Sequence, residues 1–125
     1  MTPALLPRTL PDSTIWIDHL RRGNARLAAL IDGRDALVHD FVEGELAIGH
    51  LRRDSAMLEF LAVMPRVRRA EHEEVQAMVR LHRLEGSGIG WVDAHLLASA
   101  IIEGAKLWTL DKRLLSVVTR LGVNA

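Results

Sequence analysis

Along this chain, short apolar runs alternate with longer stretches in which apolar residues recur every three or four positions. The short runs predict strands and the longer stretches predict amphipathic helices. We expect strands at 5–10, 36–39, 66–70 and 105–109. We expect a first helix that includes Ile15 and Leu20. Further helices are expected at 25–31, 41–51, 56–62, 71–84, 91–103 and 112–121. Because helices separate the strands, the pattern favours an α/β fold in which helices cover both faces of a parallel sheet.

Local signals refine these boundaries. Ser13 or Thr14 is expected to cap the first helix, and Asp40 can cap the helix at 41–51. Pro11 has no backbone N–H and is disfavoured in a central strand, so we expect it to shorten the first strand. The stretch 91–103 is apolar almost all round, which predicts a buried helix.

Composition limits the classes of function. The length of 125 residues fits a single domain, 1–125, and 49% hydrophobic residues can fill a core. The absence of cysteine excludes disulfides, thiolate metal sites and cysteine nucleophiles, and it suits a cytoplasmic location. The longest apolar runs are too short to cross a bilayer. With a formal net charge of zero, nucleic-acid binding would require a local basic surface, a metal ion or both.

Four carboxylates stand out by their positions. Asp12 and Asp111 follow predicted strands, Asp93 begins the predicted buried helix, and Glu45 lies in the helix at 41–51. Ligands of open α/β sheets bind outside the carboxyl ends of the strands. Any one of these acids alone is more typical of a helix cap than of a ligand site. Their joint placement at one sheet edge favours a site.

The helix at 41–51 offers two glutamates, and helical geometry discriminates between them. Glu45 shares a face with Phe41 and Ile48, which are four and three residues away. Glu43 points toward the side of His50, where a charge is readily solvated. A lone carboxylate on an apolar face is costly unless it is paired or serves a metal. We therefore predict that Glu45 belongs to the site and that Glu43 does not.

A cluster of carboxylates repels itself and raises the pKa values of its members. A hard divalent cation relieves that repulsion, and oxygen ligands without cysteine favour Mg²⁺, with Mn²⁺ as the alternative. Such an ion can activate water and stabilise charge on a phosphodiester. The pattern therefore indicates a metal-dependent nuclease.

Four segments carry a resemblance to a known family. They read PDSTIWIDHLR at 11–21, FVEGELAIG at 41–49, GWVDAHLLASA at 90–100 and LWTLDKRLL at 107–115. In order and spacing they resemble the four acidic motifs of VapC-type PIN-domain toxins. The resemblance spans nearly the whole chain and places the family's acids at Asp12, Glu45, Asp93 and Asp111.

The resemblance implies a three-layer α/β/α PIN-like domain with a central, mainly parallel sheet. It also implies a magnesium-dependent endoribonuclease that is the toxin of a type II toxin–antitoxin pair, is homodimeric and is inhibited by a VapB-type antitoxin. By the same resemblance, Asp12 and Asp93 would be direct metal ligands, and Glu45 and Asp111 would complete the site through water. Thr14 would orient a water molecule, and Thr109 would brace the turn into Asp111.

Two other classes remain to be weighed. A receiver-type phosphoacceptor domain needs an aspartate that ends a central strand near mid-chain, but Asp54 follows two arginines in a helical stretch. An interaction module without catalysis would not need all four acids. Magnesium-dependent RNA cleavage would separate the nuclease from both.

The histidines are expected to serve packing or surface roles, since the six show no zinc spacing. Trp16, Trp91 and Trp108 each neighbour an acid motif and are expected to pack in or near the core, with base stacking as the alternative. The arginines are expected to be mostly solvated, and some could line an RNA path. These arginines are residues 21, 22, 52, 53, 66, 68 and 69.

Overall fold

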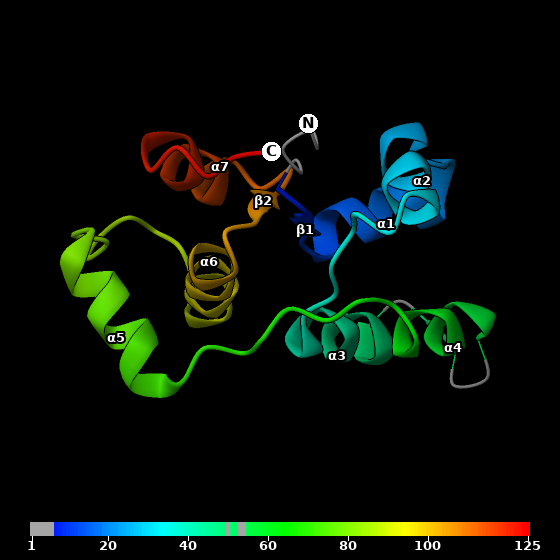
Figure 1. The fold of residues 1–125 in the computed structure, drawn as a ribbon, viewed down its shortest axis with the longest axis horizontal. Coiled ribbons are helices and arrows are strands. Elements are labelled where there is room, and N and C mark those ends of the chain that lie inside the picture. The colour runs from blue at the N-terminus through cyan, green and yellow to red at the C-terminus, as the bar shows by residue number, and fades with distance from the viewer. Residues whose placement is uncertain (1–6, 50, 53–54) are drawn as a thin grey trace, which may run out of the picture.

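A computed structural model describes residues 7–49, 51–52 and 55–125 of the chain. In this part the order of elements (Figure 1) is β1 (Thr9–Pro11), α1 (Ser13–Arg22), α2 (Ala25–Asp32), α3 (Asp40–Gly49), α4 (Ala56–Ala62), α5 (His72–Leu81), α6 (Trp91–Glu103), β2 (Lys106–Trp108) and α7 (Lys112–Arg120). Within the same part, none of the helices has the length and apolar character needed to span a membrane.

The centre of the fold is a set of parallel backbone pairings. β1 pairs with β2 in parallel, with Thr9 opposite Lys106 and Pro11 opposite Trp108. Isolated parallel bridges continue the pattern, joining Thr9 to 36, 38 to 66, and 107 to 124. In Figure 1, β2 lies beside α7 and above α6, and β1 lies between β2 and α1. The predicted fold class, an α/β domain with a central parallel sheet, is confirmed.

The core forms around the two strands. Leu10 and Leu107, the middle residues of β1 and β2, are fully buried. Helix α6 is buried at every position from Ala94 to Ala100, which confirms the prediction of a buried helix. α1 contributes Ile15 and Trp16 to the same cluster. The strands are thus held on both faces by apolar helix surfaces, and this burial fixes where they end.

The strands are shorter than predicted, and Pro11 limits the pairing on one side of β1 rather than the length of β1 itself. β1 includes Pro11, so the prediction that the proline shortens the strand from this end is wrong. Residues 5 and 6 of the predicted strand lie outside the described residues. The N–H of Asp12 donates to the carbonyl of Trp108 (2.9 Å), and on the other side of β1 the N–H of Leu37 donates to Thr9 (2.7 Å). Because donors alternate along a strand, the N–H that Pro11 lacks falls on the Leu37 side. The segments 36–39 and 66–70 accordingly form bridges rather than full strands.

Two helix caps also differ from the sequence expectation. α1 is capped by Asp12, whose side chain precedes the first turn, rather than by Ser13 or Thr14. α3 is capped by His39, whose Nδ1 accepts a hydrogen bond from the N–H of Phe41 (2.9 Å), so Asp40 is already the first helical residue. An imidazole nitrogen here does the work that an Asp or Asn oxygen usually does.

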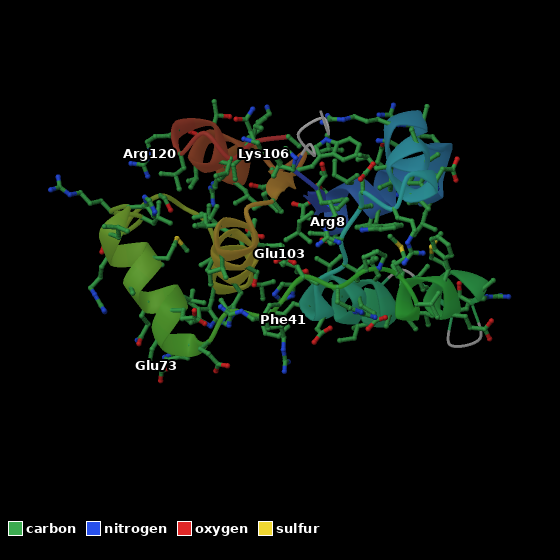
Figure 2. The ribbon with its side chains drawn as sticks, viewed as in Figure 1. Arg8, Phe41, Glu73, Glu103, Lys106 and Arg120 are labelled. Atoms are coloured by element: carbon green, nitrogen blue, oxygen red, sulfur yellow. The ribbon has the colours of Figure 1, made fainter. Side chains whose placement is uncertain are left out.

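The amino ends of the strands carry an ion pair. Arg8, which precedes β1, lies 3.6 Å from Glu103, which ends α6 (Figure 2). The acids predicted to form the site lie instead at or beyond the carboxyl ends of β1 and β2 or on α3 and α6. The two edges of the sheet are therefore chemically distinct.

Candidate active site

Asp12 is the most buried of the four predicted site acids, with 3% of its surface exposed. It follows β1 directly and begins α1. Its Oδ1 accepts hydrogen bonds from the N–H groups of Thr14 (3.0 Å) and Ile15 (3.4 Å). Burial raises the pKa of Asp12 above its usual value, and these donors together with two hydroxyls act in the opposite direction.

The two hydroxyls belong to threonines on opposite sides of the sheet edge. Thr14 donates to Oδ1 of Asp12 and Thr109 donates to Oδ2. Each hydroxyl oxygen also accepts a backbone N–H from the turn between β2 and α7, from Leu110 to Thr14 (2.9 Å) and from Asp111 to Thr109 (3.0 Å). The carboxylate of Asp12 is thereby fixed to both strand ends.

The expectation that Thr109 braces the turn into Asp111 is confirmed by this network. Its bond to Asp12 was not predicted. The two residues are 97 positions apart, so no local pattern in the sequence could have indicated the contact.

Asp111 and Asp93 lie on the helices that follow. Asp111 caps α7 by accepting the N–H of Leu114 (3.0 Å) and is exposed. Asp93 is half-buried in the first turn of α6. The pKa of Asp93 is raised by burial first, and then by the negative charges of Asp12 and Asp111. Asp12 and Asp111 therefore cap helices and also lie among the acids of the candidate site.

Glu45 joins the other acids from α3. Its pKa is raised by burial and by the charges of Asp93 and Asp12. Every one of the four acids therefore interacts electrostatically with at least one other. Within the described ranges, however, no three histidine or carboxylate side chains converge closely enough to form a ready-made metal site. The assignment of individual metal ligands stays a prediction.

The geometric reason given for Glu45 is partly wrong. The buried face of α3 is formed by Val42 and Leu46, whereas Ile48, which shares the Glu45 face, is 91% exposed. Partial burial and then the charges of Asp93 and Asp12 shape the environment of Glu45, and Ile48 takes no part in that burial. Glu43 is not simply solvated either, because its Oε2 accepts a hydrogen bond from Arg66 (2.7 Å). His50 lies outside the described residues.

Beside the acids, the structure brings together rings for which the sequence favoured packing or surface roles. His39 is fully buried, and burial lowers its pKa to about 4. Trp16 is buried as expected, but Trp91 is 46% exposed. Trp91 and His95 contact one another edge to face, with ring centroids 5.0 Å apart. The signal available in the sequence was the spacing of Trp91 and His95, four residues apart on one helix.

A parallel sheet between helices, with acids at the carboxyl ends of its strands, defines an α/β domain, and comparison with known proteins specifies the family. The PIN domain family model matches residues 9–120, so the chain belongs to the PIN-domain family. The predicted membership is thereby confirmed, and a receiver-type domain is excluded.

Within this family the chain is similar to proteins of the VapC type. It is 42% identical over 115 residues to Ribonuclease VapC32 from each of two strains of Mycobacterium tuberculosis, covering 91% of this chain and 93% of the relative. Its fold is similar to the crystal structure of PAE2754 from Pyrobaculum aerophilum, with a TM-score of 0.59 and 17% identity over 93% of this chain and 97% of that one.

Proposed function

We propose that this protein is a magnesium-dependent endoribonuclease, the toxin component of a type II toxin–antitoxin system, acting as a single PIN domain over residues 1–125. The ribonuclease relatives support the activity. The observation that carries the proposal is the electrostatic linkage of Asp12, Glu45, Asp93 and Asp111 around the carboxyl ends of the paired strands. The pKa values of Glu45 and Asp93 are raised in part by the charges of neighbouring acids of this group, as in sites arranged for a cation.

The chemistry of these donors fits a hard divalent ion. All four side chains offer oxygen, which favours Mg²⁺, with Mn²⁺ as a substitute. We assign direct coordination to Asp12 and Asp93. Oδ2 of Asp12 accepts one hydrogen bond, from Thr109, and a carboxylate oxygen has room for two partners. When bound, the ion would supply an activated water and would offset the charge on the phosphodiester.

The protein's own groups have separate roles in this proposal. Thr14 and Thr109 hold the Asp12 carboxylate in one orientation through their hydroxyls. Glu45 and Asp111, which are more exposed than Asp12, would orient water on the solvent side of the site. Fixed donors and acceptors of this kind lower the cost of reorganisation during the reaction.

The likeness to VapC proteins also supports partners. We propose a homodimer in the cytoplasm, bound by a VapB-type antitoxin whose tail places a basic side chain near the acids, because unpaired carboxylates are costly to bury. Co-expression with the neighbouring reading frames, followed by affinity purification and light scattering, tests this. Recovery of a monomer with no specific small partner would contradict it.

RNA cleavage by the purified protein tests the activity. We expect cleavage with Mg²⁺ or Mn²⁺ and none with Ca²⁺ or excess chelator, since calcium is larger and suits in-line water attack poorly. The Asp93→Asn variant, prepared in parallel, should be inactive and so controls for contaminating nuclease. Cleavage that persists in chelator would overturn the metal mechanism, and an inactive parent would favour an interaction module.

A further inference from the structure

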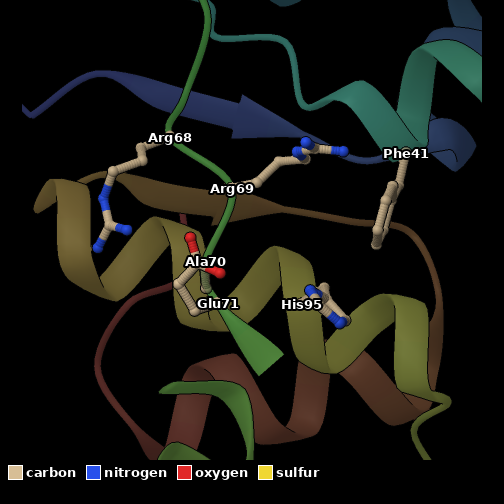
Figure 3. A pocket seen from close by; sticks show the side chains of 6 residues that line it. All are labelled: Phe41, Arg68, Arg69, Ala70, Glu71 and His95. Atoms are coloured by element: carbon tan, nitrogen blue, oxygen red, sulfur yellow. The ribbon is translucent and has the colours of Figure 1, made fainter. Parts of the chain in front are cut away.

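A pocket of about 400 Å³ lies between α3, α6 and the segment that leads into α5. Figure 3 shows Phe41 facing His95 across it, with Arg68 and Arg69 entering from the chain segment above α6. The lining combines the rings of Phe41 and His95 and the guanidinium groups of Arg68 and Arg69 with Ala70 and the carboxylate of Glu71. No role in the proposed metal site uses these residues.

The rings of the pocket belong to a longer series. Centroid distances are 4.9 Å from His39 to Phe41, 5.0 Å from Phe41 to His95, and 5.0 Å from His95 to Trp91. His95 is 8% exposed, and its Nδ1 has no hydrogen-bond partner among the described residues. Within the described part of the chain, the ring nitrogens Nε1 of Trp16 and Nε2 of His39 are buried without a partner in the same way, so the rings and the arginines of the pocket are what point to a ligand.

The two arginines are not equivalent. Arg68 is held by both oxygens of Glu74, at 3.1 and 3.0 Å. Arg69 makes one longer ion pair with Asp40, at 3.3 Å, and its side chain is 59% exposed. In Figure 3 its guanidinium points toward the side of Phe41, whereas Arg68 points away. Arg69 is thus the cation best placed to meet a ligand at the rings.

We propose that this pocket binds one unpaired nucleotide of a single-stranded RNA substrate, with its base on the ring of Phe41 beside His95 and its phosphate at Arg69. The inference rests on the proposed ribonuclease function and adds a binding site for one nucleotide of the substrate. Rings with exposed faces stack on bases of any sequence, and a guanidinium supplies the phosphate contact.

The position of the pocket relative to the acids supports this assignment. Phe41 and Glu45 are one helical turn apart on the same side of α3, whereas His95 and Asp93 are two residues apart on α6 and point to different sides of that helix. One turn of helix advances about 5.4 Å. A strand that places a phosphate at the acids would therefore bring a nearby nucleotide to the rings. The pocket would hold the substrate while the acids act on it.

The test measures binding of two short oligomers of equal charge in excess chelator, an oligoadenylate and its abasic counterpart. We expect the parent to bind the base-bearing oligomer about tenfold more tightly, as stacking on one ring implies. Phe41→Leu, which keeps apolar bulk without an aromatic face, should lose most of that ratio, and Phe41→Tyr should keep it. Phe60→Ala, on α4 and outside this pocket, serves as the aromatic control.

The role of Arg69 is tested by measuring how the binding of the same two oligomers depends on salt concentration. Arg69→Ala should weaken both oligomers equally and reduce the slope of log K against log salt by about 0.7, the loss of one single-strand phosphate contact. Arg22→Ala is the matched control, since Arg22 is also exposed and ion-paired, with Asp18 at 2.6 Å. It should leave the slope unchanged.

Several results would overturn the proposal. If Phe41→Leu weakens both oligomers equally, the base does not use this ring. If Arg69→Ala leaves RNA binding intact but abolishes association with a small protein partner, the pocket belongs to that partner. If either result is found while the parent protein still cleaves RNA, only the proposal of a nucleotide-binding pocket is refuted. A folded parent that neither binds nor cleaves RNA removes the ribonuclease function as well.

Discussion

The carboxylate of Asp12 shows how single hydrogen bonds shape the site. A buried carboxylate normally resists ionisation, yet here two backbone N–H groups and two threonine hydroxyls donate to it. Charge-assisted hydrogen bonds of this kind are stronger than neutral ones and also set direction. The same two hydroxyls fix the β2–α7 turn, so orientation of Asp12 and position of Asp111 are coupled.

Replacing Thr109 by valine tests this coupling. Thr109→Val keeps the shape but removes the donor to Asp12 and the acceptor for Asp111. We expect RNase activity to fall roughly 10–100-fold, as for other groups that orient metal ligands. Thr109→Ser, which retains a hydroxyl, should recover most of the loss. Equal activity in both variants would show that the hydroxyl does not matter.

The burial of His39 predicts how the stability of the protein depends on pH. Its pKa is about 4 in the folded protein, against 6.5 for an ordinary histidine, because it is buried. The unfolded chain therefore binds more protons between these values, and the stability that neutral His39 provides above pH 6.5 is lost as the pH falls toward 4. The loss is of the order of 3 kcal/mol.

The measurement is the free energy of unfolding across this range for the parent and for His39→Asn. Asparagine retains an acceptor for the cap but does not titrate, so its curve should be flatter. Asp12, Glu45 and Asp93 have raised pKa values and act in the opposite direction at the acid end, but equally in both proteins. Parallel curves would show that His39 is not responsible.

At the scale of elements, α3 separates two glutamates that lie two residues apart. Glu45 interacts with Asp93 and Asp12, and Glu43 pairs with Arg66. The rotation of the helix thus assigns one to the acidic cluster and the other to an ion pair. The sequence-based choice of Glu45 agrees with this arrangement, although its premise of a buried apolar neighbour in Ile48 is wrong.

Parallel glutamine substitutions test the assignment. Glu45→Gln should reduce RNase activity at least about tenfold without unfolding the protein, because one charge of the proposed metal site is lost. Glu43→Gln should retain nearly parental activity and lose less than about 1 kcal/mol of stability with the Arg66 pair. Cleavage assays and thermal melts of both variants decide. An inactive Glu43→Gln would mean that the second motif is misaligned.

The elements differ in how well the sequence predicts them. The bounds of α4 and α6 are as predicted, because periodic apolar residues and end signals at Ser55, Gly90 and Gly104 are local. The strands were harder to predict because each is three residues long and is defined by partners far along the chain. The cap at His39 was missed because an imidazole acceptor is not a common cap type.

At the scale of the whole molecule, the acids form a repulsive centre that a cation would relieve. The raised pKa values of Asp12, Asp93 and Glu45 indicate that ionising these side chains is less favourable in the folded protein than in water. A ligand that binds only the folded state stabilises it by mass action. Thermal stability is therefore a readout of the metal that does not depend on activity.

The test compares the melting temperatures of the parent and of two variants with and without Mg²⁺. Mg²⁺ should raise the Tm of the parent by several degrees. Asp93→Asn should melt a few degrees above the parent without metal, since one repelling charge is gone, and should gain little from Mg²⁺. Leu110 near the site is an exposed control position, and Leu110→Ala should respond to Mg²⁺ like the parent. A parent indifferent to Mg²⁺ would contradict the metal site.

The pairing of β1 with β2 joins residues near 9 to residues near 106, and the threonine bonds to Asp12 join the same two regions. During translation, a nascent chain that has emerged only as far as α6 lacks β2, Thr109 and Asp111. Contacts between such distant segments form late, because the intervening loop must first be closed. The proposed site therefore cannot assemble until residue 111 has emerged from the ribosome, so a partly made chain holds Asp12 without the threonine and the turn that orient it.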